Sequence, residues 1–107
     1  MVGSVLNELA KAQLVEDTMV IFLADHGMPF PGAKFNCYPD SARTPLIIRW
    51  PGKVEKGFLD WEHMISAVDL KPTILEAVGL SSPTSDGRSF LPLLYGETQL
   101  GRDHVFA

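Results

Sequence analysis

The sequence predicts an α/β fold in which a mostly parallel sheet is covered by flanking helices. An amphipathic helix over residues 2–14 leads through a short polar link into a strand over 18–24. Residues 19–24 are apolar without a break, so they do not alternate as a half-exposed strand would. Such a run is typical of a strand that is buried on both faces of a parallel sheet. Helix, tight link and buried strand together indicate one half of a crossover unit.

The remaining elements follow from turn signals and apolar periodicity. A second strand is predicted over 44–52, where it ends at a Pro-Gly pair, and a third over 61–68. A helix is predicted after Asp69, which can act as its N-cap, and Gly79 ends that helix. Residues 104–107 are expected to begin another strand.

Bulk composition excludes several classes of protein. The chain has 107 residues, enough for one modest core, and 46% of them are hydrophobic. A net charge of −4 and a pI near 5.2 do not fit a nucleic-acid-binding surface. No apolar run approaches membrane-spanning length, and no signal peptide is visible. The single cysteine, Cys37, cannot form an internal disulfide.

Asp25 and His26 lie at the carboxyl end of the first predicted strand, where ligands collect in open α/β sheets. Gly27 follows and allows the chain to turn sharply. A carboxylate and an imidazole at such a place indicate a metal or anion site. The alternative is that Asp25 begins a turn and that His26 is an ordinary loop residue.

Residues 27–43 form a long stretch without periodicity, and long irregular loops in compact domains are usually functional or disordered. Lys34 and Arg43 are its cations, and either could bind an anion. The alternative, favoured for Arg43, is a solvated surface charge.

Four segments together resemble the latter part of the sulfatase catalytic domain, which belongs to the alkaline-phosphatase-like superfamily. In order, they are V-I-F-L-A-D-H-G, R-T-P-L-I-I-R-W-P-G-K, S-A-V-D-L-K-P-T-I-L-E-A-V-G-L and D-G-R-S-F-L-P-L-L. The loop D-H-G-M-P-F-P-G-A-K is similar to that of heparan N-sulfatases (sulfamidases). The resemblance implies that residues 1–107 are a partial catalytic domain, truncated at both ends, of an alkaline-phosphatase-like sandwich.

The resemblance also implies roles for individual residues. Asp25 would be a carboxylate ligand of a divalent cation, usually calcium in this family. His26 would be a further metal ligand or a contact to the sulfate oxygens, and Lys34 would bind the sulfate group. Residues 86–89 match a structural turn rather than a catalytic segment.

The nucleophile that the family requires is missing from this chain. Sulfatases oxidise the cysteine or serine of C/S-x-P-x-R to formylglycine, and that motif does not precede Asp25. Cys37 and Pro39 have the motif's spacing, but Ser41 stands where arginine belongs, and Arg43 comes two positions late. Cys37 is therefore rejected as the nucleophile.

The resulting hypothesis is a fragment of a sulfuric ester or N-sulfate hydrolase that is inactive alone. The parent enzyme would act on a sulfated small molecule or glycan and would be exported to the periplasm, the extracellular space or the lysosome. One alternative is a phosphoester or phosphonate hydrolase of the same superfamily, with manganese or zinc. Another is a noncatalytic α/β remnant. Unpaired strand edges predict self-association, and no partnership with nucleic acid or membrane is expected.

Overall fold

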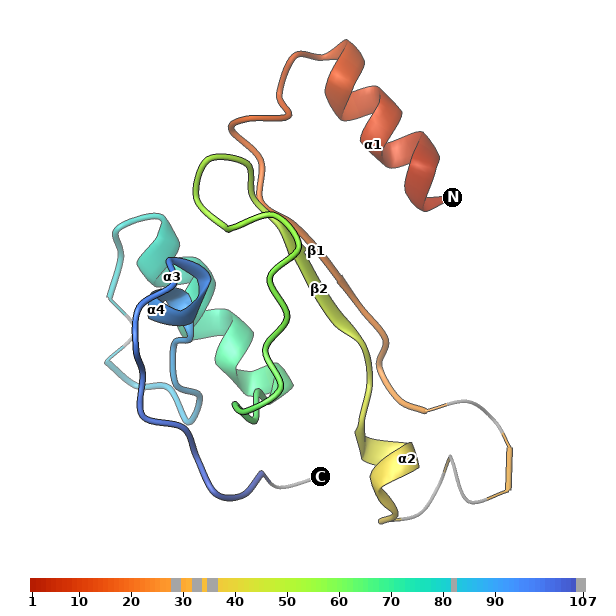
Figure 1. Cartoon of the computed structure of the whole chain (residues 1–107), viewed down its shortest axis with the longest axis vertical. Helices are drawn as coiled ribbons and strands as arrows, with labels where there is room; N and C mark the ends of the chain where they lie inside the picture. The colour runs from red at the N-terminus through yellow and green to blue at the C-terminus, as the bar shows by residue number, and fades with distance from the viewer. Residues whose placement is uncertain (28–29, 32–33, 35–36, 82, 106–107) are drawn as a thin grey trace. The chain divides into compact units, whose positions relative to one another are not determined.

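The computed structural model describes residues 1–27, 30–31, 34, 37–81 and 83–105. The contacts of the chain divide it into two units, Met1–Gly52 and Lys53–Phe106, and the main elements of each are seen in Figure 1. No helix in the described part of the chain is both long and apolar enough to cross a membrane.

The first unit begins with helix α1 (Val2–Lys11), which is three residues shorter than the sequence predicts. Gln13 has a φ of 58°, a left-handed conformation that ends the helix. Lys11 lies in the last turn, where its charge suits the helix dipole, and its Nζ is 2.7 Å from Glu8 Oε1.

Strands β1 (Val20–Leu23) and β2 (Leu46–Arg49) form a two-stranded antiparallel sheet. Both predicted strands are confirmed, although each is shorter than expected. The predicted mostly parallel sheet is not confirmed, because the pairing that the described residues make is antiparallel. Direction of pairing depends on the path of the chain between the strands, which periodicity does not report.

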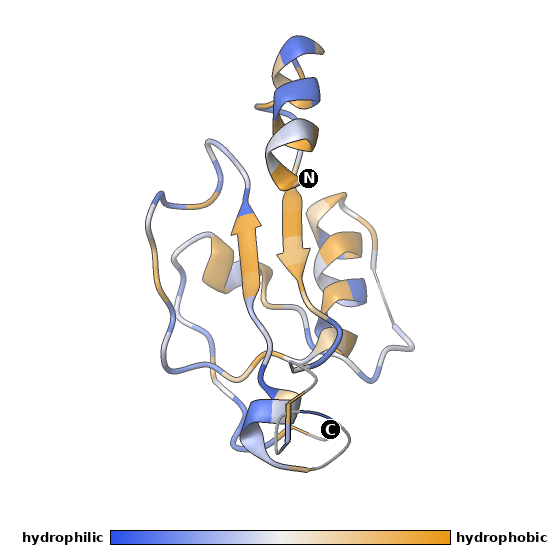
Figure 2. Ribbon diagram, turned by 90° about the vertical axis from the view of Figure 1, so that its right-hand side faces the viewer, coloured by the Kyte–Doolittle hydropathy of each residue, from blue (hydrophilic) through white to orange (hydrophobic). Residues whose placement is uncertain are grey.

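Both faces of this sheet are apolar, as the colouring of the two strands in Figure 2 shows. Phe22 pairs with Ile47, and the preceding pair is Ile21 with Ile48. Successive pairs point to opposite faces of a sheet, so each face carries an apolar pair. Phe22 and Leu23 are nevertheless 44% and 42% exposed, so the described part of the chain does not bury β1 on both faces as predicted. Self-association through such faces remains a prediction.

A short helix, α2 (Pro39–Ala42), lies within the stretch that the sequence predicts to be irregular. Pro39 occupies its first turn, where a missing N–H is tolerated. The Gly27 N–H donates to the Ser41 carbonyl at 3.1 Å. This bond ties the residue after the Asp-His pair to the helix that precedes β2.

The second unit consists of a 3₁₀ turn, η1 (Ala67–Asp69), and two helices, α3 (Leu70–Ala77) and α4 (Leu91–Leu94). The predicted strand over 61–68 is wrong: the structure has bends there and then the 3₁₀ turn. No strand begins at His104 or Val105, and the rest of that predicted strand lies outside the described residues. The apolar core is small and comprises Phe90, Leu91 and Leu93.

The carboxylate of Asp69 is buried in the second unit and joins three other residues. Asp69 is 1% exposed, and its Oδ2 accepts the Ser66 N–H at 2.8 Å, which completes a capping box on η1. Its Oδ1 accepts the Arg88 N–H at 2.8 Å and pairs with Arg102 Nη2 at 2.6 Å. Asp69 is the N-cap residue of α3, as the sequence predicts, but its carboxylate makes no capping bond to that helix.

Gly87 confirms the structural turn predicted at 86–89. A Cβ at this position would collide with the carbonyl group of Val68. The backbone of the turn thus approaches the backbone of η1 as closely as only a glycine allows.

We expect Gly87→Ala to lower the free energy of unfolding by about 1–3 kcal/mol, because backbone atoms rather than a mobile side chain must move. Urea denaturation followed by circular dichroism measures the change. Gly101→Ala is the matched control, since its Cβ would come no closer than 3.4 Å to the His63 ring. Equal losses in the two variants would contradict the close approach at Gly87.

Candidate functional site: an exposed aspartate–histidine pair after strand β1

Asp25 and His26 come directly after β1 and Ala24, as the sequence predicts. The side chain of Asp25 is 87% exposed and that of His26 is 44% exposed. Asp25 Oδ2 lies 3.5 Å from His26 Nε2, which is too long for a strong hydrogen bond. Two donor atoms therefore stand close together at the end of an apolar strand.

The backbone after β1 orients the His26 ring. His26 Nδ1 is 2.7 Å from the carbonyl oxygen of Gly27. A carbonyl oxygen can only accept, so Nδ1 carries the proton of this bond. In the neutral ring the lone pair is then on Nε2, the nitrogen that faces Asp25.

The two atoms fit one cation but do not complete its coordination. A hard cation binds oxygen at about 2.3–2.6 Å, so two of its ligands can be up to about 5 Å apart, which includes the observed 3.5 Å. Calcium requires about six to eight ligands. In the described part of the chain, no three histidine, cysteine or acidic side chains gather as a metal site would need. The pair alone could supply only part of a metal site.

The bonds of Asp25 and His26 described above do not involve Lys34. Lys34 is half-buried in the loop between Gly27 and Pro39, and six residues of that loop, at 28–29, 32–33 and 35–36, lie outside the described residues. Arg43 is exposed, which fits the solvated charge that the sequence favours. Cys37 is exposed as well.

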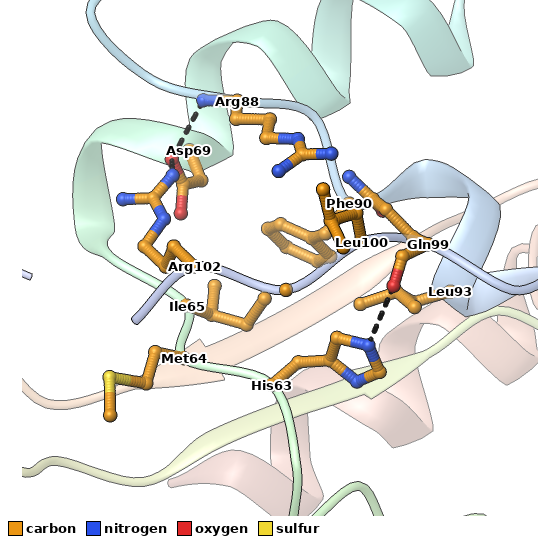
Figure 3. Close-up of a pocket in the computed structure, with 11 residues that line it drawn as sticks. His63, Met64, Ile65, Asp69, Arg88, Phe90, Leu93, Gln99, Leu100 and Arg102 are labelled. Atoms are coloured by element: carbon orange, nitrogen blue, oxygen red, sulfur yellow. Dashed lines mark hydrogen bonds and ion pairs between the residues drawn. The ribbon is translucent and has the colours of Figure 1, made fainter. Parts of the chain in front are cut away.

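A second group of polar residues was not predicted as a cluster from the sequence. A small cavity of the second unit is lined by Asp69, Arg88, Gln99, Arg102 and His63, together with apolar side chains (Figure 3). The strand that the sequence predicts over 61–68 includes His63, but the His63 ring contacts Asp60 and the Gln99 carbonyl. The contact between Asp60 and His63 could have been predicted, because the two residues are three positions apart. The contact with Gln99, 36 residues further along, gives no local signal in the sequence.

Comparison with known proteins places these features in a family. The sulfatase family profile matches residues 1–80. The human N-sulphoglucosamine sulphohydrolase is 36% identical over an alignment of 106 residues. This alignment covers 90% of this chain and 21% of that protein. An ulvan-active sulfatase of Formosa agariphila is 42% identical over 78 residues, 73% of this chain and 13% of that protein.

A solved structure gives the same result for the fold. A phosphonate monoester hydrolase from Silicibacter pomeroyi superposes with a TM-score of 0.78 at 35% identity, over 92% of this chain and 20% of that chain. The architecture is thus part of an alkaline-phosphatase-like hydrolase fold. The chain belongs to the sulfatase family, and it spans about a fifth or less of the length of these relatives. Membership implies a divalent metal in the catalytic domain, without identifying it.

We expect neutral His26 to carry its proton on Nδ1, because the Gly27 carbonyl at 2.7 Å accepts it. Nitrogen-15 chemical shifts of the neutral ring distinguish the two tautomers. A proton found mainly on Nε2 would contradict this orientation and would remove the lone pair from the face shared with Asp25.

Proposed function

We propose that this chain is a segment of the catalytic domain of a sulfuric ester or N-sulfate hydrolase and that it supplies part of the metal and sulfate site. The observation that carries the proposal is the exposed Asp25–His26 pair, 3.5 Å apart at the end of β1. The names of the relatives support a sulfated substrate, since they include an ulvan-active sulfatase and an N-sulphoglucosamine sulphohydrolase. Alone, the segment is expected to be inactive.

Asp25 and His26 would hold a divalent cation through the carboxylate and Nε2. Calcium is the proposed metal, because the most accessible donor is a hard carboxylate oxygen. The bound ion would polarise a sulfate oxygen and offset the charge that develops in the transition state. The remaining ligands and the nucleophile would come from residues that are not in this chain.

Lys34 would bind the sulfate group through its ammonium. A cation beside the anion stabilises the negative charge that grows on the leaving atom as the S–O or S–N bond breaks. Its position nine residues after Asp25, in the loop that leaves the same strand end, supports this role. The partial burial of Lys34 would strengthen the attraction by limiting solvent screening.

A second candidate function is hydrolysis of a phosphonate or phosphate ester. The observation that favours it is the structural match to a phosphonate monoester hydrolase at 35% identity. In this case manganese or zinc would be preferred, with His26 as a nitrogen ligand. The choice of metal therefore distinguishes the two candidates.

Calorimetric titration of calcium, manganese and zinc into the chain tests the metal site. We expect weak calcium binding with a Kd of about 0.1–1 mM, as suits an incomplete oxygen site. Asp25→Asn should weaken it at least about tenfold, because the amide lacks the charge of the carboxylate. A clear preference for manganese or zinc would support the phosphonate candidate instead.

The chain contains a matched control for this experiment. Asp103 and His104 repeat the Asp-His sequence, and both side chains are exposed, with Asp103 Oδ1 2.6 Å from His104 Nδ1. Asp103→Asn should leave the titration unchanged. Loss of binding in both aspartate variants, or in neither, would show that the metal does not recognise the pair after β1.

Lys34→Gln should weaken sulfate binding, measured by the shifts of backbone amide resonances as sodium sulfate is added at constant ionic strength. The lost ammonium should reduce affinity about threefold to tenfold, with Lys34→Arg retaining most of it. Lys53→Gln is the control, since Lys53 is exposed in the other unit. An unchanged response in Lys34→Gln would remove Lys34 from the proposed sulfate site.

A further inference from the structure

The second unit contains a histidine whose two ring nitrogens both face acceptors. His63 Nδ1 is 2.8 Å from Asp60 Oδ2, and His63 Nε2 is 3.0 Å from the carbonyl oxygen of Gln99. Figure 3 shows the Gln99 carbonyl directed at the ring. The first contact is local, whereas the second joins residues 36 positions apart.

A neutral imidazole cannot satisfy both acceptors. It has one N–H and one lone pair, so one of the two oxygens would face a lone pair. The imidazolium has two N–H donors and satisfies both. The geometry thus selects the protonated ring, and the carboxylate of Asp60 balances its charge.

The surroundings of the ring are consistent with this selection. Asp60 Oδ1 accepts the backbone N–H groups of Glu62 and His63 at 2.9 and 3.0 Å, so the carboxylate is held in place. Burial alone would raise the pKa of Asp60, but these donors and the His63 ring lower it below its usual value. The Gln99 carbonyl and Asp60 raise the pKa of His63 against the opposing effect of burial.

Other charges face the same cavity from the elements around it. Glu62 favours the protonated ring from the adjacent position. Arg88 and Arg102 line the cavity and oppose a further positive charge, and Asp69, which pairs with Arg102 at 2.6 Å, offsets one of them. Gly101 lies beside the ring, since a Cβ there would make an ordinary van der Waals contact with His63 Cδ2 at 3.4 Å.

A catalytic role for the Asp60–His63 pair is not supported by this geometry. A general base needs a free nitrogen within reach of the proton that it abstracts. His63 Nε2, the nitrogen distant from the aspartate, is already occupied by the Gln99 carbonyl. The pair is arranged to hold a backbone segment.

We propose that protonated His63 is a pH-sensitive clamp that fixes residues 99–102 to the segment 60–65. On deprotonation, the remaining N–H is retained on Nδ1 by the charged Asp60, and the bond to the Gln99 carbonyl is the one lost. The released segment carries Gln99, whose Nε2 donates to the Ser89 carbonyl, and Arg102, which pairs with Asp69. The clamp therefore controls how firmly this segment is held.

The direction of the pH dependence follows from the raised pKa of His63 in the folded chain. The stabilisation is fully present below the unfolded-state value of 6.5 and is lost as the pH rises through the folded-state value. Each pH unit between the two values corresponds to about a tenfold change in the protection of the clamped segment.

Two measurements on the 107-residue chain test the clamp. Proton NMR of the His63 ring, in buffer and in denaturing urea, should give a higher pKa in buffer. The segment 99–102 should lose its protection against proteinase K, measured relative to an unstructured peptide at each pH, as the pH rises from 6.5 through the folded-state value. An equal or lower pKa in buffer, or protection that is independent of pH, would overturn the proposal.

Variants separate the clamp from general stability. Asp60→Asn keeps an oxygen that accepts the two backbone N–H groups but removes the charge, so the His63 pKa should fall and the loss of protection should begin at lower pH. His63→Gln should abolish the pH dependence above pH 6.5. His104→Gln, at an exposed histidine, should leave the dependence intact, and its loss there would assign the effect to His104.

Discussion

The second unit depends on the saturation of one buried carboxylate. Asp69 is 1% exposed, and an ionised group at such depth is tolerated only when its oxygens are hydrogen-bonded and its charge is paired. The three groups that satisfy it come from Ser66, Arg88 and Arg102. One carboxylate thus links three stretches of chain in a unit whose apolar core comprises three buried side chains among the described residues. Thr73 extends the network, because its hydroxyl donates to the Asp69 carbonyl and accepts the Phe90 N–H.

Asp25 presents the opposite arrangement. Its side chain is 87% exposed, and His26 Nε2 lies 3.5 Å from its Oδ2. A carboxylate with open coordination positions at a strand end can accept a ligand, whereas the saturated carboxylate of Asp69 cannot. The difference supports an architectural role for Asp69 and is consistent with the binding role proposed for Asp25, although both aspartates follow an apolar residue.

Much of the site was predictable from sequence because its signal is local. The break from an apolar run to Asp-His-Gly marks the end of β1, and the four ordered segments identify the family, which the comparisons confirm. The fold was predicted less completely. Antiparallel pairing of β1 with β2 is a non-local property, and the apolar residues of 61–68 suggested a strand where the turn at Asp60 and the capping box at Ser66 prevail. The contacts of His63 with Gln99 and of Asp69 with Arg102 span 36 and 33 residues, beyond the range of any periodicity.

The sequence order of the Asp69 partners has a consequence for synthesis on the ribosome. Translation proceeds from Ser66 to Arg102, so the carboxylate can meet its guanidinium partner only after the segment around Arg102 has left the exit tunnel. The strands of the first unit are complete by Arg49, and they can pair more than fifty residues earlier. Until then Asp69 must remain hydrated, because its burial without Arg102 is costly. The second unit therefore acquires its final structure only after Arg102, the charged partner of Asp69, has emerged.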